Sequence, residues 1–418
     1  MSENVYDELK ARGFIAQVSD EAALRKALGE KRVTFYIGFD STATSLHAGS
    51  LVPIMAMVHL RRAGHRAIAV VGGGTTMVGD PSGREEIRRM LDEATIRAQG
   101  KAIHSQLDRY LHFDGKDAIA VDNADWLLPL NYIQFLRDIG RHFSVNRMLA
   151  AEAYKQRLEK GLSFIEFNYQ LLQAYDYLIL YRKYGCTLQM GGDDQWGNIL
   201  AGVDLIRRVE GAAAEALTFP LLTTSSGAKM GKTAKGAIWL DPELVSPYDF
   251  YQYWVNCDDR DVVRFLRIYT LLPLDEIRRL EGLKDSEINV AKHILAFEAT
   301  KITHSKEEAE KARKASTAAF GGKVISKSEV KADITGLPTT AVARVRLEAG
   351  ISPAELFTEV GLTPSRGEAK RLIKQGGLYV NDETISSLER LLTVKDLGPD
   401  KMMLLKAGKK KIHRVVVG

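Results

Sequence analysis

The first part of the chain alternates short apolar strands with amphipathic helices. Residues 33–37 are β-branched or aromatic and predict a strand, and residues 67–71 predict a second one. Between them, 51–63 has helical spacing, with a proline in its first turn and a glycine after its end. A strand, a helix and a strand in this order form a βαβ unit, the building block of a parallel sheet.

Four further segments continue this pattern. Residues 72–83 are rich in glycine and predict a turn, whereas 163–181 predict a long helix that is apolar nearly all round. A strand is predicted at 187–190, followed by two glycines and a helix over 195–209. We therefore expect an α/β fold with a doubly wound parallel sheet for roughly the first 220 residues.

The rest of the chain differs in character. Residues 248–320 hold few glycines and many charges at helical spacing, which predicts a helical domain. Periodicity fades over 321–350, which we interpret as a linker. Residues 351–418 predict a compact last unit of two short helices followed by strands.

Composition is that of a globular protein. The chain has 418 residues, which is too long for a single hydrophobic core and predicts more than one domain. Of these residues, 45% are hydrophobic and 27% charged, a composition that argues against a wholly disordered or fibrous protein. No apolar run reaches the roughly 18 residues of a membrane helix, and the charged N-terminus lacks the apolar stretch of a signal peptide. Two cysteines cannot build a disulfide framework or a four-thiolate zinc site. These features predict a soluble intracellular protein that does not bind membranes.

The net charge of +5 is small, but the last 18 residues hold six lysines or arginines and no acid. A basic end on a balanced body fits a module that binds a polyanion. A solubilising tail is the alternative, and it is the commoner meaning of a bare charge run.

Residues 38–51 lie where the first predicted strand ends and the next helix begins. Ligands bind at such strand ends in an open parallel sheet, and the N–H groups at a helix N-terminus suit phosphate. His47 adds a hydrogen-bond donor, and Gly49 allows a ligand to approach the backbone. A capping loop with an incidental histidine is the alternative interpretation.

A stretch that we call the lysine loop, residues 225–236, holds three lysines among small residues. It is not a P-loop, because that motif needs a glycine five positions before Gly231, where Ser226 stands. A mobile basic loop that closes on phosphate charge remains, against the alternative of an exposed solvated loop.

Polar residues also mark the helix predicted over 163–181. Tyr169, Gln173 and Asp176 fall on one face of it. Such a stripe either faces solvent, the commoner case, or lines a buried polar site. Asp176 stands between two tyrosines in an apolar run, which favours burial with a partner.

Residues 189–199 hold two glycines followed by acids and amides. This pattern suits a ribose, because glycine lets the backbone come close while a carboxylate binds the sugar hydroxyls. The alternative is a Gly-Gly turn with an aspartate as helix cap, and Asp80 likewise has a plain turn as its alternative.

Each pattern is modest alone, but their order and joint occurrence are specific. The chain resembles the class I aminoacyl-tRNA synthetases, and within them the bacterial tyrosyl type, nearly from end to end. His47–Ser50 (HAGS) is similar to the family's His-Ile-Gly-His motif, and Lys229–Thr233 (KMGKT) is similar to its Lys-Met-Ser-Lys-Ser loop. The stretches LQAYDYL and GGDDQWGN resemble the tyrosine-specific members more closely still.

The resemblance implies a role for each matching position. For the amino acid it implies Tyr36 and Asp176 at the phenol hydroxyl, Asp80, Tyr169 and Gln173 at the ammonium group, and Gln195 near the carboxylate. For ATP it implies Gly38, Asp40, Thr42, His47, Gly49, Ser50, Gly192, Asp194 and Lys232. The catalytic set that it implies is His47, Lys229, Lys232 and Thr233, the last three at the leaving pyrophosphate.

Two positions depart from the family pattern. Ser50 stands where a second histidine is usual, so a hydroxyl or a water must make that contact to ATP. Ile37 replaces a cysteine of some relatives, which removes a contact to the ribose. We expect an altered ATP affinity and retained activity.

The last unit resembles the alpha-L RNA-binding domain of ribosomal proteins and RNA-modifying enzymes over 365–385. A basic helix face and the lysine-rich end form an electrostatic footprint for RNA phosphates, which shifts the interpretation of that end toward binding. The RNA-binding residues that the resemblance implies are Arg366, Lys370, Arg371 and Lys374.

The resemblance also implies an organisation and a function. It implies a Rossmann-like catalytic domain with an inserted dimerisation region over 1–245, a helical domain on the anticodon side of the tRNA over 246–320, a linker over 321–350, and a small α+β domain over 351–418. The implied reaction joins L-tyrosine to its tRNA through tyrosyl-adenylate. ATP accompanied by Mg²⁺ is a substrate, no metal is bound by the protein itself, and a homodimer acts in the cytoplasm.

Three alternatives remain at this point. An RNA-binding descendant that has lost catalysis has only Ser50 in its favour. A nicotinamide-dependent oxidoreductase lacks the Gly-x-Gly-x-x-Gly spacing. Within the enzyme class, tryptophan specificity is the nearest competitor, and the pair Tyr36 and Asp176 argues against it.

Overall fold

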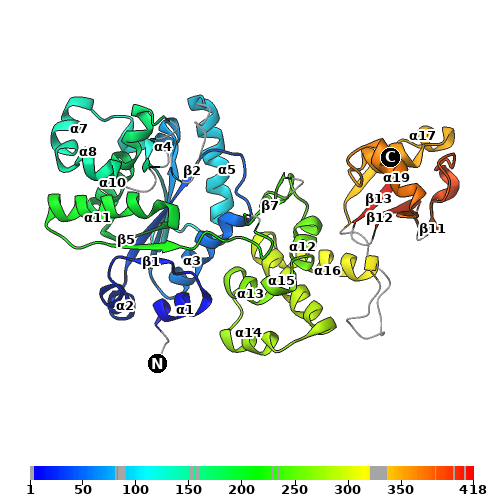
Figure 1. Ribbon diagram of the computed structural model, residues 1–418, viewed down its shortest axis with the longest axis horizontal. Coiled ribbons are helices and arrows are strands. Elements are labelled where there is room, and N and C mark those ends of the chain that lie inside the picture. Colours follow the sequence, from blue (N-terminus) through cyan, green and yellow to red (C-terminus); the bar gives the residue numbers. More distant parts are fainter. Residues whose placement is uncertain are drawn as a thin grey trace. The chain divides into compact units, whose positions relative to one another are not determined.

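The computed structural model divides by its internal contacts into two compact units, Met1–Val245 with Cys257–Ala291 and Ser246–Asn256 with Lys292–Gly418 (Figure 1). The residues that it describes are 4–80, 82, 91–150, 154–155, 158, 161–227, 229–233, 236–320, 337–381, 383–398, 401–408 and 411–418.

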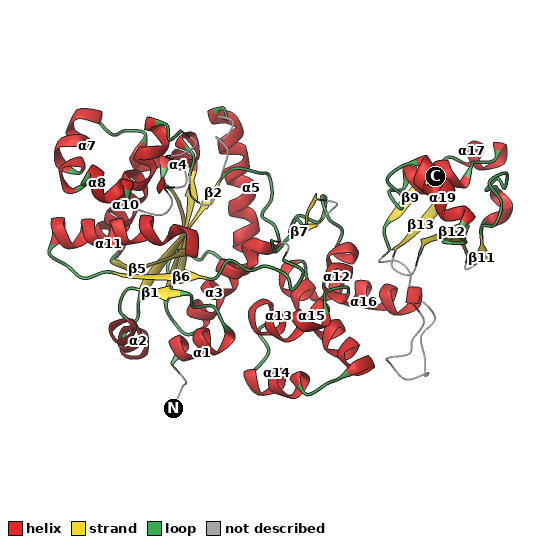
Figure 2. Cartoon of the chain, viewed as in Figure 1, coloured by secondary structure: helices red, strands yellow, loops and turns green. Residues whose placement is uncertain are grey.

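A six-stranded sheet forms the centre of the first unit (Figure 2). Its strands are β1 (Gln17–Val18), β2 (Thr34–Asp40), β3 (Arg66–Gly72), β4 (Ala118–Asp122), β5 (Cys186–Gly192) and β6 (Glu215–Phe219). They lie in the order β1-β6-β5-β2-β3-β4, and all neighbours pair in parallel except β1 with β6. The chain thus builds the sheet outward from β2 in both directions, which confirms the predicted doubly wound fold.

Long helices cover both faces of this sheet. They are α3 (Leu51–Arg62), α5 (Glu93–Leu111), α10 (Phe164–Tyr184) and α11 (Trp196–Glu210). α3 packs on α5 and α10 packs on α11, and because crossovers between parallel strands are right-handed, the two pairs lie on opposite faces (Figure 1). The helix predicted over 163–181 is confirmed. Ser163 and Glu166 form a capping box at its start, and Gly185 ends it with φ +63°.

The first unit contains further short helices and strands, and residues 248–320 are mainly helical. The first unit also contains α1 (Val5–Arg12), α2 (Glu21–Glu30), α6 (Ala124–Leu127), α7 (Tyr132–Asp138), α8 (Val145–Leu149), β7 (Lys232–Thr233) and β8 (Gly236–Ala237). The helices predicted for 248–320 are confirmed as α12 (Pro247–Val255), α13 (Val262–Tyr269), α14 (Leu274–Glu281), α15 (Ile288–Thr303) and α16 (Lys306–Phe320).

The glycine-rich segment predicted as a turn contains a short helix, α4 (Gly73–Val78). Its first N–H groups donate to side chains at the end of β4, Gly73 to Asp122 at 3.1 Å and Gly74 to Asn123 at 2.8 Å. A Cβ on Gly73 would lie 2.3 Å from the Asp122 carboxylate, so only glycine fits there. These partners are distant in sequence, and for that reason local composition, with glycine a poor helix former, predicted a turn.

The second unit ends in a five-stranded sheet. Its strands are β9 (Thr339–Val342), β10 (Leu378–Val380), β11 (Glu383–Thr384), β12 (Met402–Ala407) and β13 (Lys411–Val417), in the order β11-β10-β12-β13-β9. Three helices accompany it, α17 (Arg344–Ala349), α18 (Pro353–Glu359) and α19 (Arg366–Lys374). The two short helices and following strands predicted for 351–418 are confirmed.

The linker prediction is wrong for the C-terminal part of 321–350. β9 pairs in parallel with β13, and Val342 and Leu347 belong to the buried core of this last sheet. The short lengths of β9 and α17 explain why no periodicity marks them in the sequence. Residues 321–336 lie outside the described residues.

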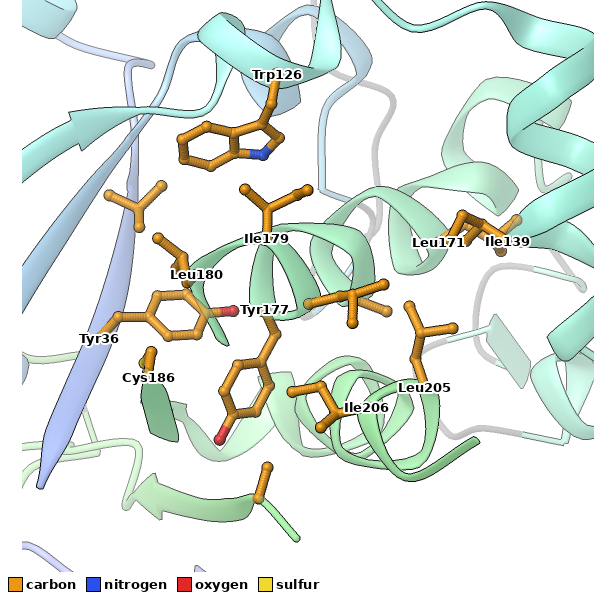
Figure 3. Close-up of a cluster of buried hydrophobic side chains, with 14 of the residues drawn as sticks. Tyr36, Trp126, Ile139, Leu171, Tyr177, Ile179, Leu180, Cys186, Leu205 and Ile206 are labelled. Carbon is orange, nitrogen blue, oxygen red and sulfur yellow. The ribbon is translucent and has the colours of Figure 1, made fainter. Parts of the chain in front are cut away.

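A large apolar cluster packs α10 and α11 against the sheet (Figure 3). Tyr36 from β2 and Trp126 from α6 are part of it, and the Tyr36 ring meets the Tyr177 ring edge-on at 5.3 Å. Close packing holds such side chains in fixed rotamers. The cluster therefore fixes the position of Tyr36 and Trp126, both of which take part in the site below.

Candidate active site

A cavity of about 230 Å³ lies at the carboxyl ends of β2, β3 and β5. Open parallel sheets bind their ligands at this edge. Ten of the residues with a predicted role in the site line the cavity, as does Ile37: Tyr36, Gly38, Asp40, Ser50, Asp80, Tyr169, Gln173, Asp176, Gly192 and Gln195. Five others are not among its lining residues: Thr42, His47, Gly49, Asp194 and Lys229.

Tyr36 and Asp176 are deeply buried in this cavity, with 2% and 4% of their surface exposed. The Tyr36 ring extends from β2 toward α10, the helix that carries Asp176 (Figure 3). The Tyr36 hydroxyl has no hydrogen-bond partner among the described residues. A buried hydroxyl without a partner is costly, so a ligand that bonds to it recovers that cost.

Two neutral donors hold the Asp176 carboxylate. Trp126 Nε1 donates to it at 2.7 Å and Asn123 Nδ2 at 2.9 Å. Burial raises the pKa of Asp176 to about 7, and the two donors oppose that rise. A carboxylate can accept about four hydrogen bonds, so a further donor in the cavity would favour its ionised form.

Sequence reasoning missed Asn123 and Trp126. Both follow β4, a strand that was not predicted, and Asn123 also donates to Thr75 Oγ1 at 3.0 Å. A signal was present, since 118–123 (AIAVDN) is an apolar run that ends in an acid and an amide. The predicted strands are likewise short apolar runs, but each of them is followed by glycine.

The polar stripe on α10 lines the cavity, and the solvent-facing interpretation is wrong. Tyr169 and Asp176 are buried, Gln173 is half-buried, and all three belong to the lining. The Gln173 Oε1 atom is buried without a partner among the described residues. It is a second acceptor to which a ligand can donate.

A half-buried carboxylate, Asp80, lies on another side of the cavity. It accepts the Ser82 N–H at 2.9 Å and the Gln195 Nε2 at 2.7 Å. Burial raises the pKa of Asp80, and the negative charge of Asp40 adds to the rise. Asn198 holds Gln195 in turn, with Nδ2 donating to Oε1 at 3.3 Å. Asp80 is thus a turn residue and also a carboxylate that a cation would stabilise.

Small residues keep the neighbouring part of the cavity open. A Cβ on Gly72 would lie 2.7 Å from Asp40 Oδ1, and the side chain of Thr75 donates to the same carboxylate at 3.3 Å. A Cβ on Gly38 in β2 would have no described atom within 4 Å, and Thr42 is exposed beyond the strand end. The backbone here can be approached closely by a flat ligand.

The segment after β5 combines a glycine with two acids. A Cβ on Gly192 would lie 2.5 Å from Asp194 Oδ1. Burial, followed by the charge of Asp80, raises the pKa of Asp194. Asp193 has a different task, because it accepts hydrogen bonds from Thr218 at 2.7 Å and Gln17 at 2.8 Å and so ties this turn to β6 and β1.

His47 caps the turn that leads into α3. Its Nδ1 accepts the Gly49 N–H at 3.0 Å, so the neutral ring carries its proton on Nε2. The Ser50 hydroxyl accepts the His47 N–H at 3.5 Å and completes a capping box. The loop is therefore a capping loop in which the histidine is itself the cap and not an incidental residue.

The lysine loop packs on this same turn. Gly231 has φ +77°, and a Cβ there would lie 2.6 Å from the Gly49 nitrogen. The Ile238 carbonyl accepts the Ala48 N–H at 2.7 Å. The two motifs that are far apart in the sequence therefore meet through their backbones.

The side chains of the lysine loop are described only in part. Lys229 is exposed and its backbone pairs with Thr223. Lys232 and Thr233 form β7, and their side chains lie outside the described part of the structure.

The basic residues predicted to bind RNA are exposed on α19. They are Arg366, Lys370, Arg371 and Lys374, and the opposite face buries Ala369 and Ile373. Arg371 pairs with Glu368 at 2.6 Å and Arg366 with Glu355 at 3.3 Å. Exposed ion pairs of this kind contribute little, so they can exchange for phosphate contacts.

Neither a metal cluster nor a membrane helix occurs in the described residues. They contain no group of three or more His, Cys, Asp or Glu side chains that could hold a metal ion. In the same part of the chain, no helix is long and apolar enough to cross a membrane.

Two protein families match the chain. The family described as "tRNA synthetases class I (W and Y)" matches residues 28–321, and the family described as "Tyrosine--tRNA ligase SYY-like C-terminal domain" matches 329–415. The chain is 55% identical over 418 residues to a tyrosine–tRNA ligase of Syntrophus aciditrophicus, covering 98% of this chain and 97% of that protein. It is 52% identical over 413 residues to a tyrosine–tRNA ligase of Lachnoclostridium phytofermentans, covering 99% of each.

Solved structures resemble the chain over about three quarters of its length. A C-terminally truncated mitochondrial tyrosyl-tRNA synthetase of Aspergillus nidulans superimposes with a TM-score of 0.68 at 32% identity, covering 74% of this chain and 92% of that one. A tryptophanyl-tRNA synthetase of Encephalitozoon cuniculi, bound to tryptophan, superimposes with a TM-score of 0.56 at 13% identity, covering 74% and 90%. The second likeness concerns the fold alone.

Proposed function

The chain belongs to the class I tyrosyl-tRNA synthetases, and from this premise we propose how its residues carry out tyrosine–tRNA ligation. It is an aminoacyl-tRNA ligase that uses ATP. The reaction forms tyrosyl-adenylate and then transfers the tyrosyl group to a ribose hydroxyl of the terminal adenosine of the tRNA. One observation carries the assignment of the site: the Tyr36 hydroxyl is buried, has no hydrogen-bond partner among the described residues, and lies in the cavity that Asp176 also lines.

Tyr36 and Asp176 recognise the phenol hydroxyl of the substrate in this proposal. Asp176 accepts a hydrogen bond from the phenol hydroxyl, and the Tyr36 hydroxyl donates a hydrogen bond to the phenol oxygen. Two features support it: the Tyr36 hydroxyl needs a partner, and the Asp176 carboxylate retains acceptor capacity beyond Asn123 and Trp126. Phenylalanine would leave the buried Tyr36 hydroxyl without an acceptor and Asp176 without the further donor, which is why it is rejected.

The amino and carboxylate ends of tyrosine meet a different group of residues. Asp80, Tyr169 and Gln173 bind the ammonium group, and Gln195 lies near the carboxylate. The raised pKa of Asp80 supports this, because a bound cation lowers the cost of its negative charge. Gln195 and Asp80 are already bonded, so one network orients both ends of the substrate.

The activation step needs no covalent enzyme group. A tyrosine carboxylate oxygen forms a bond to the α-phosphorus of ATP, the bond from that phosphorus to the bridging oxygen breaks, and pyrophosphate leaves with the electron pair. The enzyme therefore works by positioning and by stabilising negative charge on the phosphates. Mg²⁺ arrives with ATP and shares that charge.

The ATP contacts are assigned to both motifs and the strand ends. His47 Nε2–H, Lys229, Lys232 and Thr233 face the phosphates, with the last three at the pyrophosphate. The residues assigned to the adenosine side are Gly38, Asp40, Thr42, Gly49, Ser50, Gly192 and Asp194. The backbone contact between Gly231 and the turn at Gly49 supports this, because it brings the lysine loop beside His47. The Ser50 hydroxyl lines the cavity and supplies the contact of the missing histidine.

The tRNA is bound by other parts of the chain. We propose a catalytic domain over 1–245, a helical domain over 246–320 on the anticodon side, and an RNA-binding domain that begins with β9 at Thr339. The exposed basic face of α19 supports the last assignment, because it offers Arg366, Lys370, Arg371 and Lys374 to RNA phosphates.

Dimerisation and cellular location complete the proposal. Exposed apolar side chains gather on α7, α8 and the start of α10, including Tyr132, Ile133, Val145 and Phe164 with 56%, 71%, 56% and 70% of their surface exposed. Such a concentration is unusual on a monomer surface and fits an interface with a second copy. Sedimentation should give a dimer that Ile133→Asp weakens. The cytoplasm, where tRNA is charged in bacteria, is the proposed place of action.

Tyrosine-dependent exchange of pyrophosphate into ATP tests the proposed function. The assay with each of the twenty amino acids should give exchange with tyrosine and little with phenylalanine or tryptophan. Exchange with tryptophan would favour the other specificity of the family. No exchange with any amino acid would favour an RNA-binding protein without catalysis.

A further inference from the structure

Hydrogen bonds from the start of α13 hold residues 223–225, the segment that precedes the lysines of the lysine loop. The Arg264 guanidinium donates to the Thr223 carbonyl at 2.5 Å, and the Ser225 N–H donates to Asp261 Oδ2 at 2.9 Å. The same Arg264 nitrogen donates to Asp261 Oδ1 at 2.7 Å. Two side chains at the start of α13 therefore bind each other and two backbone groups of one short segment.

Asp261 binds the Ser225 N–H and the Arg264 side chain and caps no N–H group of α13. It is the N-cap residue of α13, yet its side chain makes no capping hydrogen bond there. It is almost fully buried, with 3% of its surface exposed. A buried carboxylate that loses its donors is strongly disfavoured, so this geometry favours the loop arm staying in contact.

Backbone hydrogen bonds connect the segment around residues 222–225 directly to the segment that carries Lys229. The Met230 N–H donates to the Leu222 carbonyl at 3.0 Å, and Lys229 forms a backbone bridge with Thr223. Met230 is buried, with 5% of its surface exposed. A displacement of residues 222–225 therefore also displaces Lys229.

The other end of α13 is fixed to the N-terminal helix. The buried Arg12 of α1 donates to the carbonyls of Arg267 at 3.0 Å, Thr270 at 3.3 Å and Leu272 at 2.7 Å. These bonds satisfy carbonyls at the C-terminus of the helix, which otherwise have no partner in it. α13 is thus fixed at its C-terminal end, so it can support residues 223–225, which the start of the helix binds.

We propose that Asp261 and Arg264 are positioning residues for adenylate formation, which hold the lysine loop where Lys229 and Lys232 meet the leaving pyrophosphate. This inference rests on the proposed function, since the lysines act on pyrophosphate only if the chain makes an adenylate. In the part of the chain that the structure describes, the side-chain hydrogen bonds of the pair go to Thr223, to Ser225 and within the pair, and none goes to Tyr36, Asp80 or Asp176. Its effect should therefore appear in the rate and not in tyrosine binding.

The test compares Arg264→Gln and Asp261→Asn with Glu281→Gln in the full-length protein. Glu281 of α14 forms an exposed ion pair with Arg267 of α13, at 2.9 Å, so its substitution controls for the loss of a charge pair on α13. Arg264 is partly exposed, so its substitution is tolerated by the fold even if Asp261→Asn is not. Single-turnover adenylate formation, the KM for ATP and equilibrium tyrosine binding are measured for each.

The rate of adenylate formation should fall by about ten- to hundredfold in both loop-support variants, the factor that corresponds to one charge-assisted hydrogen bond. Tyrosine affinity should be unchanged, and Glu281→Gln should behave as the unmodified protein. In a chain that also carries Lys229→Ala and Lys232→Ala, Arg264→Gln should have no further effect, because the loop then has nothing to position.

Two results would overturn the inference. One is a rate for Arg264→Gln equal to that of Glu281→Gln, and the other is an Arg264→Gln effect that persists without the two lysines. Either result is distinct from a failure of the proposed function, in which the unmodified protein itself forms no adenylate.

Discussion

Replacing Asp176 by asparagine should stabilise the free protein at alkaline pH while it impairs tyrosine recognition. Burial raises the pKa of this carboxyl from 3.8 to about 7. A group whose pKa is higher in the folded state stabilises the fold at low pH and loses that contribution as the pH rises through the folded value. The site therefore carries a charge that folding disfavours and that a bound phenol stabilises.

The magnitude follows from the two pKa values. With 3.8 in the unfolded chain and about 7 in the folded one, the free energy of unfolding should fall by about 2.5 kcal/mol between pH 5 and pH 8, relative to a side chain that does not ionise. The asparagine has only one oxygen to accept from both Asn123 and Trp126, and the lost bond costs about 1–3 kcal/mol at every pH. The pH-dependent difference between the two proteins is therefore the informative quantity.

Urea unfolding of both proteins at several pH values, without tyrosine, measures this difference. The stability of Asp176→Asn relative to the unmodified protein should rise by about 2.5 kcal/mol from pH 5 to pH 8 and then level off. Asp117→Asn removes an exposed carboxylate directly before β4 and serves as the control for the loss of a carboxylate. Parallel curves for Asp176→Asn and the unmodified protein would refute the reasoning, because Asp176 would then not titrate between these pH values.

Three further outcomes are expected. Lys229→Ala should slow adenylate formation by about 10²–10³ and leave tyrosine affinity unchanged, and an equal loss in equilibrium tyrosine binding would make the loop a structural element. Gly231→Ala should slow the same step at least about tenfold, because its Cβ would meet the Gly49 nitrogen at 2.6 Å. Gly227 also has a positive φ but no described atom within 4 Å of its Cβ position, so Gly227→Ala should keep more of the rate. Equal rates for the two variants would contradict the importance of the contact between Gly231 and Gly49. A chain that ends at residue 320 should form adenylate at close to the intact rate and charge tRNA poorly, and charging at the intact rate would remove the C-terminal domain from tRNA binding.

The sequence predicted those elements whose pattern is local. The strands at 33–37, 67–71 and 187–190 correspond to β2, β3 and β5 because β-branched or apolar runs end there in glycine or polar residues. The helix over 163–181 was predicted from a long, mainly apolar stretch in which Tyr169, Gln173 and Asp176 share one helical face. Burial of Asp176 was indicated by its two tyrosine neighbours, and the structure confirms it with 4% exposure.

Contacts between distant segments could not be predicted in this way. The helix α4 depends on acceptors at Asp122 and Asn123, about fifty positions further along the chain. The same strand end supplies the donors to Asp176, and the support of the lysine loop at Asp261 is 36 positions from Ser225. The family motifs located the cavity, but the side chains that hold those motifs in place are visible only once the chain is folded.

The ratio of kcat/KM for tyrosine to kcat/KM for phenylalanine tests the central claim most directly. It is measured by pyrophosphate exchange in the unmodified protein and in Tyr36→Phe combined with Asp176→Asn. The unmodified protein should discriminate by about 10⁴–10⁵, a factor for which tyrosyl-tRNA synthetases are themselves the reference case. The double variant should discriminate far less, because the two groups that phenylalanine strands in the pocket are gone. An unchanged ratio would contradict the account, because the phenol hydroxyl would then be recognised elsewhere.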